Sequence, residues 1–136
     1  MYLLDTNVVS ELRRPKPHGA VLAWIAGTPA RELFIPAITL AEIQAGIEIV
    51  RGQNERRAKE LEAWLDGVAG SSNVLPMDGE TFRTWARLMH GRPDKFYEDA
   101  MVAATAICHD LIVVTRNERD FRDFDVRILN PFVAVN

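Results

Sequence analysis

The chain has 136 residues, of which 48% are hydrophobic and 26% charged, as in an ordinary water-soluble domain. This length predicts a single domain over residues 1–136 that buries about two-thirds of its unfolded surface. The net charge of −3 predicts no broad nucleic-acid-binding face, but it is compatible with a local basic patch beside an acidic site. Cys108 is the only cysteine, which excludes an internal disulfide and suits a reducing cytoplasm. The first residues contain neither a basic leader nor a long apolar stretch, so we expect no signal peptide and no membrane span.

Apolar runs and amphipathic segments alternate along the chain. Short apolar runs predict strands at residues 1–5, 32–36, 73–76, 111–115 and 126–129. Helical spacing of apolar residues predicts helices at 6–13, 19–26, 39–51, 54–68, 78–90 and 99–109. We expect Phe82, Trp85 and Met89 to face the core, and the nearly apolar helix at 99–109 to be buried on every side. This alternation predicts an α/β fold with a central, mainly parallel sheet flanked by helices.

The first predicted strand ends on Asp5-Thr6-Asn7, and two interpretations of these polar residues are open. Thr6 or Asn7 could cap the next helix by accepting a backbone N–H. Alternatively, Asp5 belongs to a functional site, because ligands bind at the carboxyl ends of strands in α/β sheets. Taken alone, the stretch favours capping.

Three further acids occupy positions that can converge with Asp5. Glu42 lies in the first turn of a predicted helix, Asp99 begins the apolar helix, and Asp120 follows the strand at 111–115. In a parallel sheet, the carboxyl ends of strands and the amino ends of the following helices share one edge. Simpler explanations exist, since Thr39 and Glu42 fit a capping box and acids are favoured near helix amino ends. Loop acids such as Asp120 usually face water.

The chemistry of such a cluster is constrained by repulsion. Two bare carboxylates about 4 Å apart repel by ~4 kcal/mol at an effective dielectric constant near 20, so a cluster must protonate or bind cations. Oxygen ligands without nitrogen or sulfur suit Mg²⁺ or Mn²⁺. The histidines lack zinc spacing, no phosphate-binding glycine loop is present, and Cys108 is expected to be an inert packing residue. The reaction that remains is metal-assisted attack by water on a phosphodiester.

Four stretches in this order carry a resemblance to a known family: Leu3-Leu4-Asp5-Thr6-Asn7, residues 36–43 with Gly46, residues 97–106, and residues 111–121. Together they span nearly the whole chain. The chain resembles the PIN-domain ribonucleases, specifically the VapC-type toxins of bacterial toxin–antitoxin pairs. One departure is Asp110, where members of that family often turn on glycine.

The resemblance implies a three-layer PIN-like domain and a cytoplasmic, Mg²⁺-dependent endoribonuclease, with Mn²⁺ as an alternative metal. The implied metal and catalytic residues are Asp5, Glu42, Asp99 and Asp120, supported by Asn7, Thr115 and Asn117. The implied partners are an RNA substrate, a cognate VapB-type antitoxin and a second copy of the chain, with a larger antitoxin-bound assembly as a further possibility.

Two Mg²⁺-dependent phosphotransfer classes are the alternatives. A haloacid dehalogenase-type phosphatase needs a second Asp two residues after the first, where this chain has Asn7. A receiver-like domain needs paired acids after strand 1 and a Lys after the last strand, where this chain has Thr6 and Asn130. Labelling by a phosphodonor would separate both classes from a nuclease.

Partner-binding residues are less constrained by the sequence. Phosphate contacts could come from either of two basic sets, Arg13, Arg14 and Lys16, or Arg51, Arg56, Arg57 and Lys59. The second set alternates with acids, which favours a solvated helix face. For an inhibitory partner, we expect an amphipathic helix docked near Leu12, Ile43 and Trp64, followed by an Arg or Lys that reaches the acids.

Overall fold

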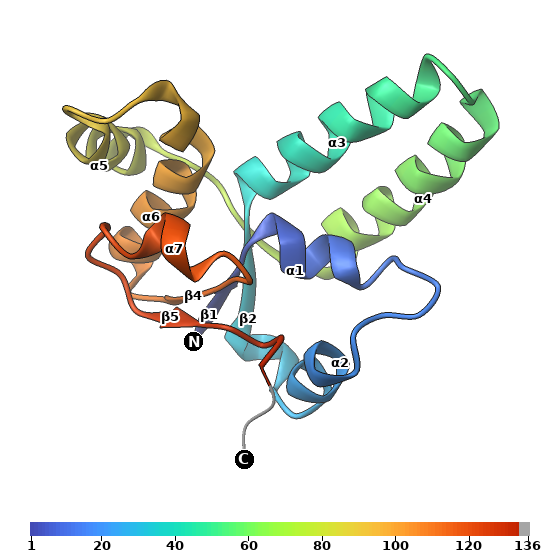
Figure 1. Cartoon of the computed structure of the whole chain (residues 1–136), viewed down its shortest axis with the longest axis horizontal. Coiled ribbons are helices and arrows are strands. Elements are labelled where there is room, and N and C mark those ends of the chain that lie inside the picture. The colour runs from blue at the N-terminus through green and yellow to red at the C-terminus, as the bar shows by residue number, and fades with distance from the viewer. Residues whose placement is uncertain (134–136) are drawn as a thin grey trace.

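A five-stranded sheet in the order β3-β2-β1-β4-β5 forms the centre of the molecule (Figure 1). The structure, a computed structural model, describes residues 1–133. The strands are β1 (Tyr2–Leu4), β2 (Leu33–Pro36), β3 (Asn73–Leu75), β4 (Ile112–Val114) and β5 (Ile128–Leu129). All four strand pairs are parallel, with β1 between β2 and β4. The predicted α/β fold with a central parallel sheet is therefore confirmed.

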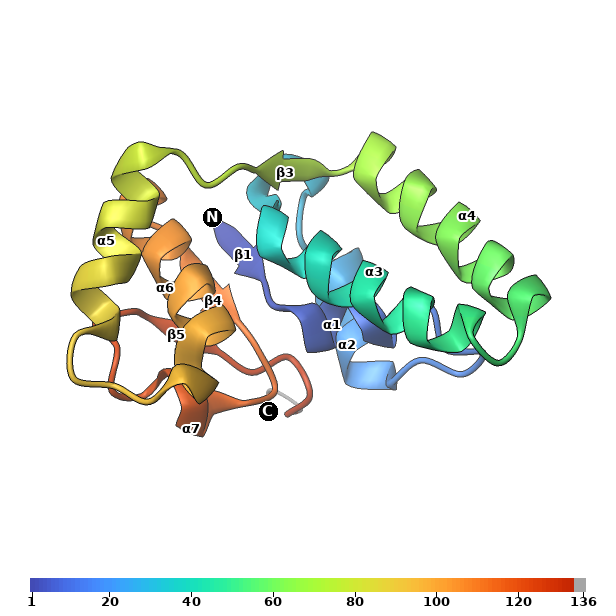
Figure 2. The same cartoon turned by 90° about the horizontal axis from the view of Figure 1, so that it is seen from above.

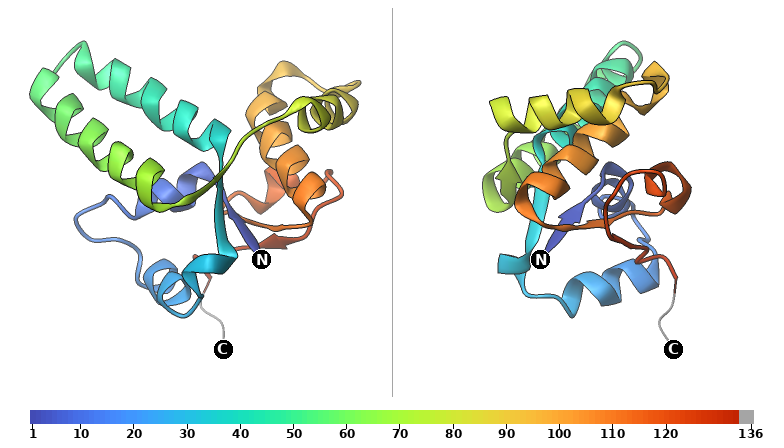
Figure 3. Two further views of the ribbon diagram at one scale, coloured as in Figure 1. Left: turned by 180° about the vertical axis from the view of Figure 1, so that it is seen from behind. Right: turned by 90° about the vertical axis from the view of Figure 1, so that its left-hand side faces the viewer.

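Helices cover both faces of this sheet. They are α1 (Thr6–Glu11), α2 (Gly19–Ala26), α3 (Ala37–Arg51), α4 (Glu55–Ser71), α5 (Gly79–Met89), α6 (Tyr97–His109) and α7 (Glu118–Phe121), with 3₁₀ turns at Ala30–Glu32 and Asp94–Phe96. Helices α3 and α4 pack together as a hairpin, and α5 packs against α6 (Figures 2 and 3). Among residues 1–133, no helix is long and apolar enough to cross a membrane.

The two faces of the sheet bury separate clusters because neighbouring strand residues point in opposite directions. Leu4, Ile35 and Val114 pack with α1, α2, α3 and α4, whereas Leu3 and Val113 pack with α5, α6 and α7. Fully buried apolar residues lie on both sides. The result is a three-layer domain whose central strand ends at Asp5.

Two predicted packing positions were wrong. Phe82 is 46% exposed, because α5 instead turns Thr81, Trp85 and Leu88 toward the core and Phe82 lies one position off that stripe. Helix α6 is buried through Ala106 but emerges at its carboxyl end, where Ile107 and Cys108 are exposed. The Cys108 thiol lies 3.5 Å from the Thr84 hydroxyl and is not an internal packing group.

The turn after α6 adopts a left-handed conformation at Asp110, with φ of 53° and ψ of 53°. Asp110 is the one non-glycine residue with positive φ in the part of the chain that the structure describes. Its side chain accepts a hydrogen bond from Arg127 Nη2 at 3.0 Å. The turn leads directly into β4, which pairs with the strand that carries Asp5.

Candidate active site

The four predicted acids come from four elements that meet near the carboxyl edge of the central strands. Asp5 follows β1, Glu42 lies in the second turn of α3, Asp99 lies in the first turn of α6, and Asp120 lies in α7. The pKa of Asp99 is raised by burial and by the charges of Asp5, Asp120 and Glu42, in that order. Asp5, Glu42 and Asp120 therefore all lie near enough to Asp99 to act on it electrostatically, which agrees with the expected convergence of the four acids.

Asp5 is the most firmly held member of this group and is only 5% exposed. Its Oδ1 accepts the Thr6 backbone N–H at 2.8 Å, which makes Asp5 itself the cap of α1. Its Oδ2 accepts the Thr115 hydroxyl at 2.9 Å and Nδ2 of Asn7 at 3.1 Å. Burial raises the pKa of Asp5, and these hydrogen bonds oppose the rise by stabilising the charged form. Of the two interpretations of this stretch, capping by Thr6 or Asn7 is therefore excluded, because Asp5 itself is the cap.

Thr115 and Asn7 connect this carboxylate to the chain beyond β4. Asn7 Nδ2 also donates to Thr115 Oγ1 at 3.2 Å, and Asn7 Oδ1 accepts the Arg116 backbone N–H at 3.0 Å. The Asn117 backbone N–H donates to Thr115 Oγ1 at 3.0 Å, whereas its side chain is exposed. Asn7 and Thr115 thus touch the acid directly, and Asn117 supports it through its backbone.

Glu42 belongs to the site and not to a helix cap. Helix α3 begins at Ala37 with Pro36 at the cap position, so Thr39 already lies inside the helix and the predicted capping box is wrong. The Thr6 hydroxyl lies 3.1 Å from both Glu42 Oε1 and the fully buried Thr39 hydroxyl. Burial raises the pKa of Glu42, the Thr6 hydrogen bond lowers it, and the charges of Asp5 and Glu98 raise it further.

Asp99 has the clearest electrostatic signature. Its pKa is raised from 3.8 to about 7, first by burial and then by the neighbouring carboxylates. Unlike Asp5, it accepts no side-chain or backbone hydrogen bond from the residues that the structure describes. A carboxyl with these surroundings binds a proton or a cation far more readily than an ordinary aspartate.

Asp120 is half-buried, whereas its neighbours Glu118, Asp123 and Asp125 are exposed. Helix α7, which is too short to show a sequence periodicity, turns Asp120 toward the other acids and Phe121 into the core. Spacing alone did not distinguish Asp120 from these surrounding acids, whereas the family resemblance selected it, and its burial agrees with that choice.

The donor set suits a hard divalent cation. Within the described residues 1–133, no three acidic, histidine or cysteine side chains are arranged around a single point so as to hold an ion among themselves. Mg²⁺ is ordinarily held by one or two carboxylates together with several waters, so a complete protein cage is not required. Asp5 and Asp99, whose charges act on each other, fit this mode, with Glu42 and Asp120 nearby.

Comparison with known proteins identifies the family. The family model for the PIN domain matches residues 2–127 of the chain. The chain belongs to the PIN domain family. This PIN domain is 36% identical to the VapC ribonuclease Y4jK of Sinorhizobium fredii, over 97% of this chain and 98% of that protein.

Two further comparisons agree. The PIN domain is 33% identical to Toxin FitB of Neisseria gonorrhoeae, over 97% of this chain and 99% of that protein. It also matches a chain in the crystal structure of FitAcB from Neisseria gonorrhoeae with a TM-score of 0.81 and 33% identity, covering 97% of this chain and 99% of that one. The resemblance found in the sequence motifs is therefore confirmed.

Thr6 and Glu98 are site residues that the motifs did not single out. Thr6 was considered only as a cap, yet its hydroxyl contacts Glu42. Glu98 raises the pKa of both Glu42 and Asp99, but it stands beside Asp99 in the sequence and nothing in the spacing distinguished its role.

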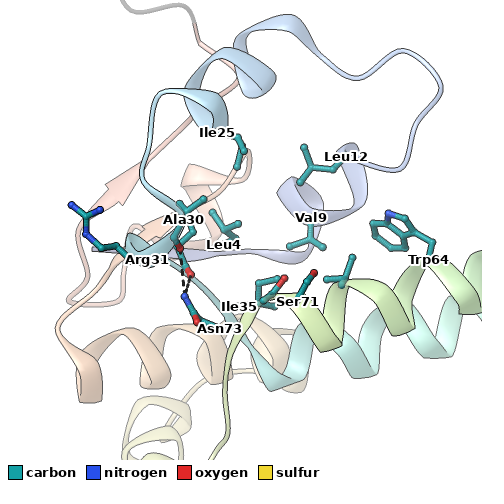
Figure 4. A pocket seen from close by; sticks show the side chains of 13 residues that line it. Leu4, Val9, Leu12, Ile25, Ala30, Arg31, Ile35, Trp64, Ser71 and Asn73 are labelled. Atoms are coloured by element: carbon teal, nitrogen blue, oxygen red, sulfur yellow. Dashed lines mark hydrogen bonds between the residues drawn. The ribbon is translucent and has the colours of Figure 1, made fainter.

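Two grooves are lined by residues of α1 and α4, and one of them reaches the site. One, of about 430 Å³, is lined by apolar side chains that include Leu12, Ile25 and Trp64 (Figure 4). The second, of about 230 Å³, contains Ile43 and Trp64 and reaches Glu42. The apolar surface expected near Leu12, Ile43 and Trp64 is thus divided between two grooves that share Trp64.

Proposed function

We propose that this PIN domain is a metal-dependent endoribonuclease that hydrolyses RNA phosphodiester bonds with Mg²⁺, or alternatively Mn²⁺. The observation that carries the proposal is the convergence of Asp5, Glu42 and Asp120 around the half-buried Asp99 at one edge of the sheet. The identity with a VapC ribonuclease over nearly the whole chain supports the same activity.

In this proposal, Asp5 and Asp99 hold the cation, while Glu42 and Asp120 hold its waters or a second cation. A bound divalent ion lowers the pKa of water and stabilises charge on the leaving oxygen. The chain contributes a fixed geometry: Thr115 and Asn7 hold the Asp5 carboxylate in one orientation, and the Thr6 hydroxyl restrains Glu42. Without a cation, Asp99 takes up a proton near neutral pH, since its pKa is about 7.

The test is cleavage of a labelled RNA by the wild type and Asp99→Asn, each with Mg²⁺, Mn²⁺ or EDTA. The wild type should cleave only with metal, and the variant should lose about 10²-fold or more in rate, the usual cost of removing one charge-stabilising group. Asp66→Asn is the matched control, because this substitution removes the same charge from a residue that is exposed on α4. Cleavage by Asp99→Asn at the Asp66→Asn rate would reject the assignment.

The haloacid dehalogenase-type alternative is disfavoured by the residue two places after Asp5. That residue is Asn7, whose amide donates to Asp5 Oδ2 and to Thr115 and carries no acidic proton to transfer. A phosphodonor should therefore leave the protein unlabelled.

We also propose that the nuclease works in the cytoplasm and is restrained by a cognate antitoxin of the VapB type, with a homodimer or a larger antitoxin-bound assembly as its resting form. Support comes from Toxin FitB of Neisseria gonorrhoeae, which is named as a toxin and is 33% identical over nearly the whole chain. In this chain, the groove that contains Leu12 and Trp64 provides an apolar surface on which a partner helix could dock (Figure 4).

A further inference from the structure

A basic hollow lies next to the acids, and the proposed function has not used it. This hollow, of about 500 Å³, is lined by Asn7, Arg13, Arg14, Arg57 and Arg116 among others. The four arginines come from the end of α1, the start of α4 and the turn after β4, and all are exposed. They are spread over more than a hundred positions of the sequence, so only the fold brings them together.

The hollow is continuous with the acidic site through shared residues. Asn7 lines the hollow and also donates to the Asp5 carboxylate at 3.1 Å. Arg13 lines both the hollow and the neighbouring groove that contains Glu42. A polyanion seated on the arginines would therefore pass directly beside Asp5 and Glu42.

Two of the arginine side chains, Arg14 and Arg116, are held in place but retain free donors. Glu11, which is buried, accepts the His18 backbone N–H at 2.9 Å and pairs with Arg14 Nη1 at 3.2 Å. The Arg116 guanidinium lies 4.6 Å from the centre of the Phe132 ring. A guanidinium carries five N–H donors, so one pairing or one stacked face leaves several donors for phosphate oxygens.

Electrostatics explains why such a surface is needed. The chain has a net charge of −3, and the reacting phosphodiester must approach four carboxylates. Phosphates on either side of that bond are repelled as well, unless a local positive surface offsets the repulsion. Arginine pairs with phosphate through two parallel hydrogen bonds, which fixes position as well as charge.

We infer that Arg13, Arg14, Arg57 and Arg116 form a subsite for the sugar–phosphate backbone of single-stranded RNA, adjacent to the carboxylates. The inference rests on the proposed ribonuclease function, and it names the surface that holds the substrate. The subsite binds backbone and does not read base identity, because the charged groups that it offers are guanidinium groups, which pair with phosphate oxygens.

The experiment measures binding of a labelled single-stranded RNA of mixed sequence in EDTA, over a series of KCl concentrations. Arg13→Gln and Arg116→Gln should each weaken binding and reduce the slope of log K against log [KCl] by about 0.7 per lost phosphate contact. The control is Arg56→Gln, one residue from Arg57 but 92% exposed and outside the hollow, which should leave affinity and slope unchanged. Thermal unfolding of each variant checks that the fold is kept.

Cleavage with Mg²⁺ separates this inference from the proposed function. If the wild type cleaves RNA but Arg13→Gln and Arg116→Gln match Arg56→Gln in both binding slope and kcat/KM, the subsite is wrong and the nuclease assignment stands. If no metal supports cleavage by the wild type, the proposed function fails whatever the binding slopes show. Unchanged RNA binding with reduced binding of a co-purified protein partner would assign the arginines to that partner and overturn the inference.

Discussion

Asp5 carries a buried carboxylate beside three other acids, and the hydrogen bonds that it accepts keep its charged form available for a cation. The Thr115 hydroxyl is central among them, since it donates to Oδ2 at 2.9 Å and accepts from Asn7 and the Asn117 backbone. A group that orients a metal ligand typically contributes 10- to 100-fold to metal affinity.

Thr115→Val should therefore lower Mg²⁺ affinity by about 10- to 100-fold, because it keeps the side-chain shape and removes the hydroxyl. Titration calorimetry with Mg²⁺ measures the change. The control is Thr105→Val, at another fully buried threonine, whose hydroxyl donates only within α6 to the Met101 carbonyl at 2.9 Å. Equal affinities in the two variants would show that Thr115 does not support a metal ligand.

The raised pKa of Asp99 makes the metal-free protein sensitive to pH. Because this pKa is about 7 in the folded protein and 3.8 ordinarily, the folded state keeps a proton that the unfolded state releases. The free energy of unfolding of the wild type should therefore fall as pH rises from about 4 to about 7. Asp99→Asn cannot ionise, so in EDTA its stability relative to the wild type should increase across that window.

Urea titrations at several pH values in EDTA test this pH dependence, and parallel curves for the two proteins would contradict it. Added Mg²⁺ should stabilise the wild type more than Asp99→Asn, because the ion binds the folded state. If repulsion among the carboxylates were the only effect, Asp5→Asn would raise the free energy of unfolding in EDTA as much as Asp99→Asn does. In Asp5→Asn, however, an amide nitrogen in place of Oδ2 would face the Asn7 Nδ2 donor, so we expect a smaller increase in stability for that variant.

Among the elements, the turn from α6 into β4 has an avoidable conformational cost. Asp110 has a positive φ. Residues other than glycine adopt this backbone conformation at a cost of roughly 1–2 kcal/mol, and the cost is smaller for Asp and Asn. Its ion pair with Arg127 is highly exposed and contributes little.

Asp110→Gly should consequently raise the free energy of unfolding by up to about 1 kcal/mol and leave cleavage unchanged. Chemical denaturation measures this change. Asp110→Ala removes the same carboxylate without relieving the backbone, so it should be less stable than the wild type. A glycine variant no more stable than the alanine variant would show that the turn is not strained.

Sequence periodicity predicted these elements well where they were long or strongly patterned. The strands and the six longer helices lie where apolar spacing placed them, and α2 begins and ends at the predicted residues. Helix α7 has four residues, about one turn, so no periodicity could reveal it. Thr39 looked like a cap because helix propensity does not fix the first turn, and α3 in fact begins two residues earlier.

The candidate site likewise contains residues that the sequence predicted and residues that it did not. Topology indicated that Asp5, Glu42, Asp99 and Asp120 could converge at one edge of a parallel sheet, and the family resemblance chose Asp120 among its neighbouring acids. The basic hollow was not predictable, because Arg57 belongs to α4 and Arg116 follows β4, and only the complete fold brings both residues to the same hollow. From the sequence, Arg57 belonged to a set alternating with acids, and its partner Glu60 lies 3.5 Å away.

For the molecule as a whole, the proposed inhibition by a partner would use the groove lined by Leu12 and Trp64, because the neighbouring groove shares Trp64 and reaches Glu42. A helix docked along Leu12 and Trp64 could extend an Arg or Lys toward Asp5 and Asp99, where it would compete with a cation.

Replacing that basic residue of a co-purified partner with Ala should preserve binding through the helix and weaken inhibition, most clearly at high Mg²⁺. RNA cleavage titrated with the partner at low and high Mg²⁺ measures this. The control is Ala substitution of a basic residue on the solvent side of the same helix. Inhibition that does not change with either variant would indicate simple obstruction of the site.

The central position of β1 also governs when the acids can act during synthesis. The Asp5 backbone N–H bonds to Val114 O at 2.9 Å, and the Asp5 carboxylate depends on Thr115, 110 residues later. At ordinary translation speeds, roughly 5–20 s separate the synthesis of these two residues. A nascent chain thus carries Asp5, Glu42 and Asp99 without the strand that organises them, so the proposed site cannot assemble until β4 emerges and pairs with β1.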